Sequence, residues 1–284
     1  MSIDILFQPY MQRAMITAGL AALACGVIGV FIVLRGLSFM GAGMAHSAFA
    51  GAVLGILLGI NPLALGLVFA IAMAFGVGYT SKKGKIGEDV SIGILFSFMM
   101  ALAIFFIKLL PGYNTEAYGY LFGDVLNSSW ADALTISIMA IIVVSLTILF
   151  FKEFQAITFD EEMALAMGLP VALIFYLMLS LMSVTIVASM SVVGAILVFA
   201  MITAPAAAAH QLTHKLDVML ILSVAFAEIS AFGGLITTAI FPELPPGPVI
   251  VFYTVLIFFL AMEFSPKRRR LKKVTHKKWG DSVN

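Results

Sequence analysis

Long stretches without a charged side chain constrain the fold of this chain more than any other feature. Residues 36–81 contain no Asp, Glu, Lys or Arg, and residues 163–214 contain none either. Of the 284 residues, 62% are hydrophobic and 11% are charged, whereas a soluble domain carries about 25% charged residues. Too few polar side chains remain to cover a soluble globule, which excludes a cytosolic enzyme, a disordered protein and an ordinary nucleic-acid binder. The composition therefore predicts an all-α, membrane-spanning helix bundle.

Nine hydrophobic segments are visible, each near the length of about 20 residues that a transmembrane helix needs. Their limits lie near residues 14–34, 38–60, 62–80, 90–110, 131–151, 171–190, 192–209, 217–240 and 248–264. The sixth and seventh segments join with only Ser189 and Ser191 between them, so one of the two can be re-entrant and the bundle has eight or nine spans. We expect one transmembrane domain over residues 1–264 and a basic tail over residues 265–284.

Lysine and arginine residues set the expected orientation, because short cytoplasmic loops are rich in them. Lys82, Lys83 and Lys85 place the loop after the third segment in the cytoplasm. The tail carries eight of the 16 basic residues, which places the C-terminus on the same side and predicts contact with anionic lipid. An even number of crossings separates these two points, so the assignments agree, and the N-terminus is expected outside. We therefore expect a multi-pass protein of the plasma membrane, or of the inner membrane if the source has two.

The second segment combines a stripe of small residues with a histidine. His46 lies beside the stripe, inside the expected membrane-spanning segment. An ionisable side chain at that depth usually faces a cavity or a partner, and a neutral imidazole is a good ligand for zinc, manganese or iron. The alternative is a histidine that is hydrogen-bonded to a neighbouring helix. The stripe itself, which lets another helix approach closely, consists of Gly43, Ser47, Gly51, Gly55 and Gly59.

Glu228 is the other ionisable residue expected inside the membrane, in the middle of the segment 217–240. A carboxylate at the bilayer centre costs about 2.5–3.5 kcal/mol, which favours a functional role over a packing role. Together, His46 and Glu228 predict a path for a cation. The single cysteine, Cys25, excludes a Cys-rich zinc or iron–sulfur site.

His210 and His214 stand four residues apart in the sequence H-Q-L-T-H, at the cytoplasmic end of a predicted span. On a helix they would share one face. The spacing is similar to the H-E-x-x-H of zinc proteases, but Gln211 occupies the position of the general base, so protease chemistry is not expected. The pair is either two interfacial histidines or a metal exit site.

Residues 159–170 are predicted to form a short cytoplasmic helix between two spans. Asp160 or Thr158 can cap its start, and Gly168 can end it. Its apolar side chains suit the groove of a partner protein or the lipid interface. The chain has no G-x-x-x-x-G-K-[ST] phosphate-binding loop, so any ATP chemistry must come from another polypeptide.

Six blocks of sequence, in order along the chain, resemble the membrane permease subunits of ATP-binding-cassette importers for zinc, manganese or iron, the ABC-3 permease family. Residues 34–51 are similar to the family pattern R-x-L-S-L-x-G-D-A-L-S-H-A-x-L-P-G, and residues 159–169 are similar to F-D-x-E-x-A-x-x-x-G-L. The remaining blocks are G-E-D-V-S-I-G at 87–93, Y-L-F-G-D-V-L at 120–126, V-G-A-I-L-V to P-A-A-A-A at 193–209, and P-P-G-P-V-I-V at 245–251.

The resemblance implies a permease subunit that forms the translocation path of an ATP-driven importer for manganese, zinc or iron, without covalent chemistry in this chain. It implies two permease chains, two cytoplasmic ATPase subunits and an extracellular metal-binding protein. The metal ion would be cargo, and no permanently bound cofactor is expected. The family's region of coupling to the ATPase corresponds here to Phe159, Asp160, Glu161, Glu162, Met163, Ala166 and Gly168.

One position departs from the family pattern. The acid that stands four residues before the histidine in the family is Ala42 here, so this first site lacks a carboxylate. Glu228 is the candidate to supply one from another helix. The alternative function is an autonomous secondary transporter or channel for a divalent cation. Such proteins usually carry internal repeats and several buried ions, and the sequence shows no clear repeat.

Overall fold

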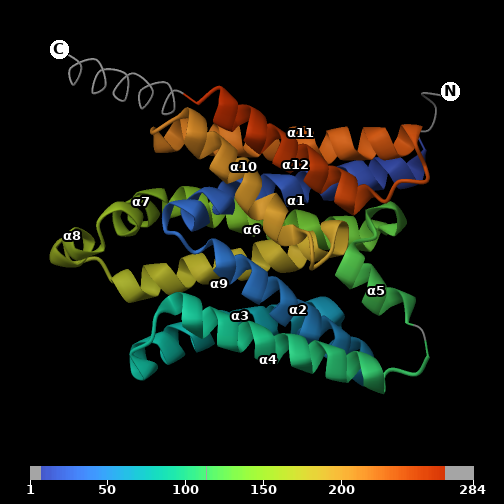
Figure 1. The fold of residues 1–284 in the computed structure, drawn as a ribbon, viewed down its shortest axis with the longest axis horizontal. Coiled ribbons are helices and arrows are strands. Elements are labelled where there is room, and N and C mark those ends of the chain that lie inside the picture. The colour runs from blue at the N-terminus through green and yellow to red at the C-terminus, as the bar shows by residue number, and fades with distance from the viewer. Residues whose placement is uncertain (1–7, 113, 266–284) are drawn as a thin grey trace, which may run out of the picture.

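All regular secondary structure in the described part of the chain is helical, which confirms the predicted class (Figure 1). The computed structural model describes residues 8–112 and 114–265, so the predicted basic tail lies outside the described residues from residue 266 on. In chain order the helices are α1 (Pro9–Leu34), α2 (Ser38–Leu58), α3 (Pro62–Gly84), α4 (Glu88–Leu109), α5 (Thr115–Phe122), η2 (Val125–Asn127, a 3-10 turn), α6 (Trp130–Leu149), α7 (Phe151–Phe159), α8 (Glu161–Ala166), α9 (Val171–Val193), α10 (Val198–Leu212), α11 (Leu216–Ile240) and α12 (Pro246–Glu263).

Within the described residues, eight helices are long and apolar enough to cross a membrane. They are α1, α2, α3, α4, α6, α9, α11 and α12. The remaining predicted segment, 192–209, forms α10, which has 15 residues. At 1.5 Å per residue α10 is about 22 Å long, shorter than the roughly 30 Å hydrocarbon core. The prediction of eight or nine spans therefore resolves into eight full-length helices and one short one.

The link between α9 and α10 is not helical, because α5 holds it in place. The amide of Ala195 donates to the carbonyl oxygen of Tyr120 at 2.9 Å, and the amide of Ile196 donates to that of Leu121 at 3.3 Å. Gly194 has a φ of +90°, and a Cβ at this position would meet the backbone of Gly123. Irregular backbone at membrane depth is tolerated where protein covers it, and here α5 provides that cover.

Small residues on α1 bring α10 and α11 close to it in the centre of the bundle. A Cβ on Gly26 would lie 2.7 Å from the Cα of Val224 in α11, and a Cβ on Gly29 would collide with the carbonyl oxygen of Ile202 in α10. Ser223 of α11 donates a hydrogen bond of 2.7 Å to the carbonyl oxygen of Gly26. These contacts replace the hydrophobic driving force that is missing between helices in lipid.

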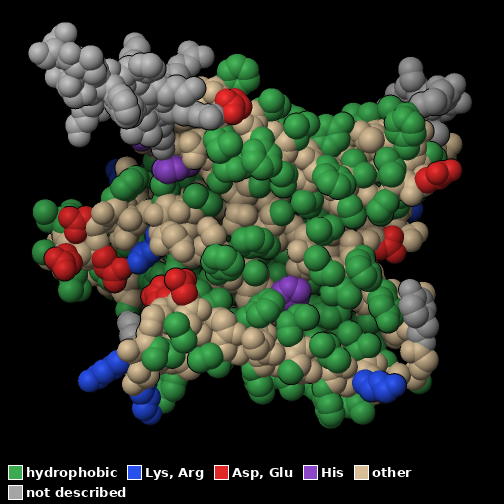
Figure 2. Space-filling model, viewed as in Figure 1, with side chains coloured by type: hydrophobic (Ala, Val, Ile, Leu, Met, Phe, Trp, Pro, Cys, Tyr) green, Lys and Arg blue, Asp and Glu red, His purple; other side chains and the backbone are tan. Residues whose placement is uncertain are grey.

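The two ends of the bundle differ. The short helices α7 and α8 lie at one end, which they share with the turn between α3 and α4, and α5 lies at the other end (Figure 1). Figure 2 shows hydrophobic side chains across the middle of the visible face and charged side chains gathered toward the two ends. This distribution is typical of helices that face lipid. The lysine-rich turn and the α7–α8 segment share one end, as the predicted orientation requires.

Candidate functional site

His46 lies in α2 with one ring nitrogen unused. Its side chain is half-buried, and Nδ1 is buried with no hydrogen-bond partner among the described residues. The imidazole packs edge-on against the ring of Phe96 in α4, with the ring centroids 5.0 Å apart. The structure therefore contains no hydrogen bond from Nδ1 of His46 to a neighbouring helix among the described residues. A neutral imidazole nitrogen is a common metal ligand.

The small-residue stripe beside His46 is the surface on which α3 packs. The Ser47 hydroxyl donates a hydrogen bond of 2.7 Å to the carbonyl oxygen of Phe69. A Cβ on Gly51 would lie 2.5 Å from the carbonyl oxygen of Leu65, and one on Gly55 would lie 2.8 Å from the Cα of Pro62. Gly43 faces the side chain of Met73, and Gly59 ends α2 with a φ of +67°. The stripe holds α3 in place while His46 is directed toward α4.

Glu228 lies in α11, on the other side of the bundle from α2. A Cβ on Gly19 of α1 would lie 3.4 Å from its Oε2 atom, and this oxygen has no hydrogen-bond partner among the described residues. Helix α11 packs mainly against α1, α10 and α12, whereas α2 packs mainly against α3, α4 and α9 (Figure 1). The structure therefore does not bring His46 and Glu228 together within one chain. No group of three or more His, Cys, Asp or Glu side chains that could hold a metal ion occurs in the described residues.

The expectation that His210 and His214 share one helical face is wrong. Helix α10 contains His210 in its last turn but ends at Leu212, and Thr213 is extended, with a φ of −139°. The Thr213 hydroxyl oxygen accepts a hydrogen bond of 3.1 Å from the amide of Lys215, so the backbone turns toward α11 before His214. An exposed His214 after the end of the helix does not form an i, i+4 pair.

The short cytoplasmic helix predicted over residues 159–170 is α8, and a second short helix, α7, precedes it. Asp160 separates them in an extended conformation and caps α8, because its side chain accepts a hydrogen bond of 2.9 Å from the amide of Met163. Gly168 ends the segment with a φ of +82°. Ala164 packs inward, and the exposed apolar side chains of the segment are Phe159, Met163, Leu165 and Met167. The sequence predicted the cap and the end of α8 but not the preceding helix α7.

The contacts of Arg35 were missed at the level of sequence. Its guanidinium lies at the end of α1 and contacts α7, α8 and α9, with an ion pair of 2.6 Å to Glu161. Arg35 stands inside the motif at 34–51, but nothing in the spacing indicates a partner far along the chain.

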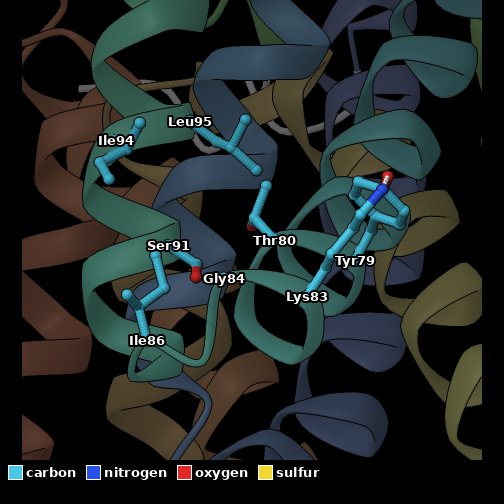
Figure 3. Close-up of a pocket in the computed structure, with 8 residues that line it drawn as sticks. All are labelled: Tyr79, Thr80, Lys83, Gly84, Ile86, Ser91, Ile94 and Leu95. Atoms are coloured by element: carbon cyan, nitrogen blue, oxygen red, sulfur yellow. Dashed lines mark hydrogen bonds between the residues drawn. The ribbon is translucent and has the colours of Figure 1, made fainter.

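Two grooves at opposite ends of the bundle differ in chemistry. The first, of about 470 Å³, lies between the ends of α3 and α4 (Figure 3). Lys83 donates to the Tyr79 hydroxyl there at 2.7 Å. No carboxylate or imidazole stands among the described residues that line this groove. Its lining residues are Tyr79, Thr80, Lys83, Gly84, Ile86, Ser91, Ile94 and Leu95.

The second groove, of about 400 Å³, lies at the α5 end and is acidic, with Glu116, Asp124 and Asp132 in its wall. Asp132 accepts from the amide of Ser129 in a capping box, and Asp124 accepts from Asn127. Burial, with smaller contributions from Glu116 and Asp132, raises the pKa of Tyr120 to about 12, so its phenol stays protonated at neutral pH. The described residues of this groove thus present negative charge without a basic side chain.

Residues 8–265 match the model of the ABC 3 transport family. The chain belongs to this family. This ABC-3 chain is 40% identical over 259 residues to the manganese transport system membrane protein MntC of Listeria monocytogenes, a match that covers 91% of the chain and 92% of the relative. It is 33% identical to the manganese import system permease protein ScaB of Streptococcus gordonii, and the match covers 93% of this chain and 94% of that relative. It is 34% identical to a probable iron transport system membrane protein of Haemophilus influenzae, and the match covers 92% of this chain and 96% of that relative.

The fold of this ABC-3 chain is also similar to solved structures. A chain of PsaBC from Streptococcus pneumoniae in complex with Fab matches it with a TM-score of 0.87 and 32% identity, over 95% of this chain and 97% of that one. The relatives are membrane subunits of transport systems, so the role of the chain is transport across a membrane and not catalysis of a covalent reaction.

Proposed function

We propose that this chain is the permease subunit of an ATP-driven importer of a divalent transition metal, with manganese, iron or zinc as cargo. The observation that carries this proposal is the similarity of nearly the whole chain to permeases whose names specify manganese or iron transport. We place the protein in the plasma membrane, with the α7–α8 end in the cytoplasm and the α5 end outside. Two copies would form the translocation path.

His46 is the residue we assign to the path. It stands within α2, its Nδ1 atom has no partner among the described residues, and imidazole suits first-row transition metals. A path needs only weak ligation, because an ion that binds tightly leaves slowly. Two copies of the chain around one axis would supply two such imidazoles, with water completing the coordination of the ion.

The exposed face of α8 is the surface we assign to a cytoplasmic ATPase subunit. It combines the apolar side chains of Met163, Leu165 and Met167 with the carboxylates of Glu161 and Glu162. Free exposure of this much apolar surface is unfavourable, whereas a groove on a partner would bury it. The acidic groove at the α5 end is the region we assign to cation arrival from an extracellular metal-binding protein.

Association with the ATPase subunit tests this assignment. Met163→Asp combined with Glu161→Lys and Glu162→Lys should abolish co-purification of the ATPase subunit with the detergent-solubilised chain, because it places a charge in the apolar contact and reverses two others. Leu244→Asp is the matched control, since Leu244 is also an exposed apolar residue but lies in the turn between α11 and α12, at the opposite end. Equal ATPase recovery with the triple variant and the control would refute the docking surface.

A further inference from the structure

Arg35 is held by three separate elements at the end of the bundle where α8 lies. Its Nη1 atom donates to the carbonyl oxygen of Ile157 in α7 at 3.1 Å, and its Nη2 atom donates to Glu161 of α8 at 2.6 Å. The guanidinium carbon lies 4.7 Å from the centroid of the Phe175 ring in α9. A planar guanidinium can make all three contacts at once, whereas the ammonium of lysine cannot reproduce this geometry.

The exposure of the partners argues against a role in stability alone. The Arg35 side chain is 14% exposed, but that of Glu161 is 57% exposed. Ion pairs of such exposed carboxylates contribute little to folding. The carboxylate of Glu161 belongs to α8, and Arg35 lies at the end of α1 against α9. The ion pair between them therefore sets the position of α8 relative to α1 and α9.

The backbone next to Arg35 joins it directly to the helix of His46. Gly36 follows with a φ of +70°, and the amide of Leu37 donates to the carbonyl oxygen of Ile32 at 3.0 Å. This hydrogen-bonded helix end leaves little freedom between α1 and α2, which begins at Ser38. His46 lies eight residues further, about 12 Å along the α2 axis. A displacement of Arg35 would therefore shift the start of the helix that carries His46.

A groove of about 580 Å³ adjoins this contact. Arg35, Glu161 and Phe175 line it together with Glu88, the first residue of α4. The groove leaves open space beside α8. Helix α4 also carries Phe96, the ring against which His46 packs.

We propose that Arg35 is the positioning residue through which movement of α8 reaches the α1–α2 junction and His46. This inference rests on the proposed function, because it requires an ATPase subunit that moves α8. When the ATPase changes its conformation, α8 carries Glu161 with it, and Arg35 follows through the ion pair. The metal-path helix then moves with the ATPase cycle.

The ratio of manganese taken up to ATP hydrolysed tests this role. The full chain is reconstituted with its ATPase subunit in phospholipid vesicles, and both rates are measured with Mn²⁺ as the probe. Arg35→Lys, Arg35→Glu and Glu161→Arg should each lower the ratio by about tenfold. Because Glu161 also lies on the proposed docking surface, both rates are normalised to the amount of ATPase subunit that is bound in each variant. Because Glu161 is exposed, Glu161→Arg is not expected to disturb folding, and it keeps the test valid if an Arg35 variant unfolds.

Charge reversal distinguishes transmission from a merely structural role. The double variant Arg35→Glu with Glu161→Arg should take up about three times more manganese per ATP hydrolysed than either single variant does. Arg35→Glu combined with Glu162→Arg is the matched control, and it should recover nothing because Glu162 has no ion pair among the described residues. A wild-type ratio in Glu161→Arg, or equal recovery by the two pairs, would overturn the role of Arg35. If the wild-type chain takes up manganese without ATP, the proposed function itself fails.

Discussion

At the scale of single residues, the distinctive feature is an imidazole in α2 without the carboxylate that the family pattern places one turn earlier. Ala42 and His46 are both half-buried, and residues four apart are neighbours on a helix surface. A carboxylate at position 42 would therefore stand next to the imidazole. We propose that the absence of this carboxylate weakens metal binding in the path and leaves the imidazole as the ligand.

Restoring the carboxylate should strengthen manganese binding. We expect Ala42→Asp to lower the dissociation constant for Mn²⁺ by about tenfold or more, since each added ligand contributes directly to the coordination shell. Ala42→Asn, with nearly the same volume and no charge, should leave the constant within about twofold. Equilibrium binding of Mn²⁺ to the purified chain measures both. Equal constants for the two variants would show that position 42 does not face the metal.

Glu228 should be separable from the His46 path. Helix α11 packs away from α2, and Oε2 of Glu228 has no hydrogen-bond partner among the described residues. Glu228→Gln therefore replaces the carboxyl group by an amide of similar size without breaking a hydrogen bond of this oxygen. We expect this variant to insert normally into the membrane and to keep about half of the wild-type uptake or more. Loss of uptake in a correctly inserted Glu228→Gln variant would return the carboxylate to the cation path.

At the scale of helices, the α2–α3 contact depends on the absence of side chains at particular positions. Gly51→Ala should lower the midpoint of thermal unfolding in detergent, because its Cβ would lie 2.5 Å from the backbone oxygen of Leu65. Overpacking of this kind costs about 1–3 kcal/mol. Gly43→Ala is the control, since its Cβ would meet the flexible end of Met73. Both changes gain the same helix propensity, so equal midpoints would mean that the close approach of α3 is not needed for stability.

The helices show which structural features can be predicted from sequence. The limits of the spans and the cap of α8 were predictable, because apolar length and the Asp160 cap are properties of neighbouring residues. The end of α10 at Leu212 and the late start of α10 were not, since they depend on Thr213 and on backbone hydrogen bonds from α5. The pattern H-Q-L-T-H alone therefore suggested a helical histidine pair that the structure does not contain.

At the scale of the whole molecule, the candidate site was predictable only in part. His46 was identified because an ionisable residue in an apolar segment is unusual, but its orientation toward Phe96 follows from the packing of α2 against α3 and α4. The separation of His46 from Glu228 reflects the arrangement of all the helices. The same holds for the ion pair between Arg35 and Glu161, which lie 126 residues apart in the sequence.

The central claim is that this chain carries a divalent metal ion only when an ATPase subunit acts on α8, along a path that includes His46. The most direct test is manganese accumulation in vesicles that contain the chain, with and without the ATPase subunit and ATP. We expect accumulation only when both are present, and a decrease of at least about tenfold in His46→Ala with the ATPase still bound. Equal accumulation without the ATPase subunit would contradict the account and favour an autonomous transporter or channel.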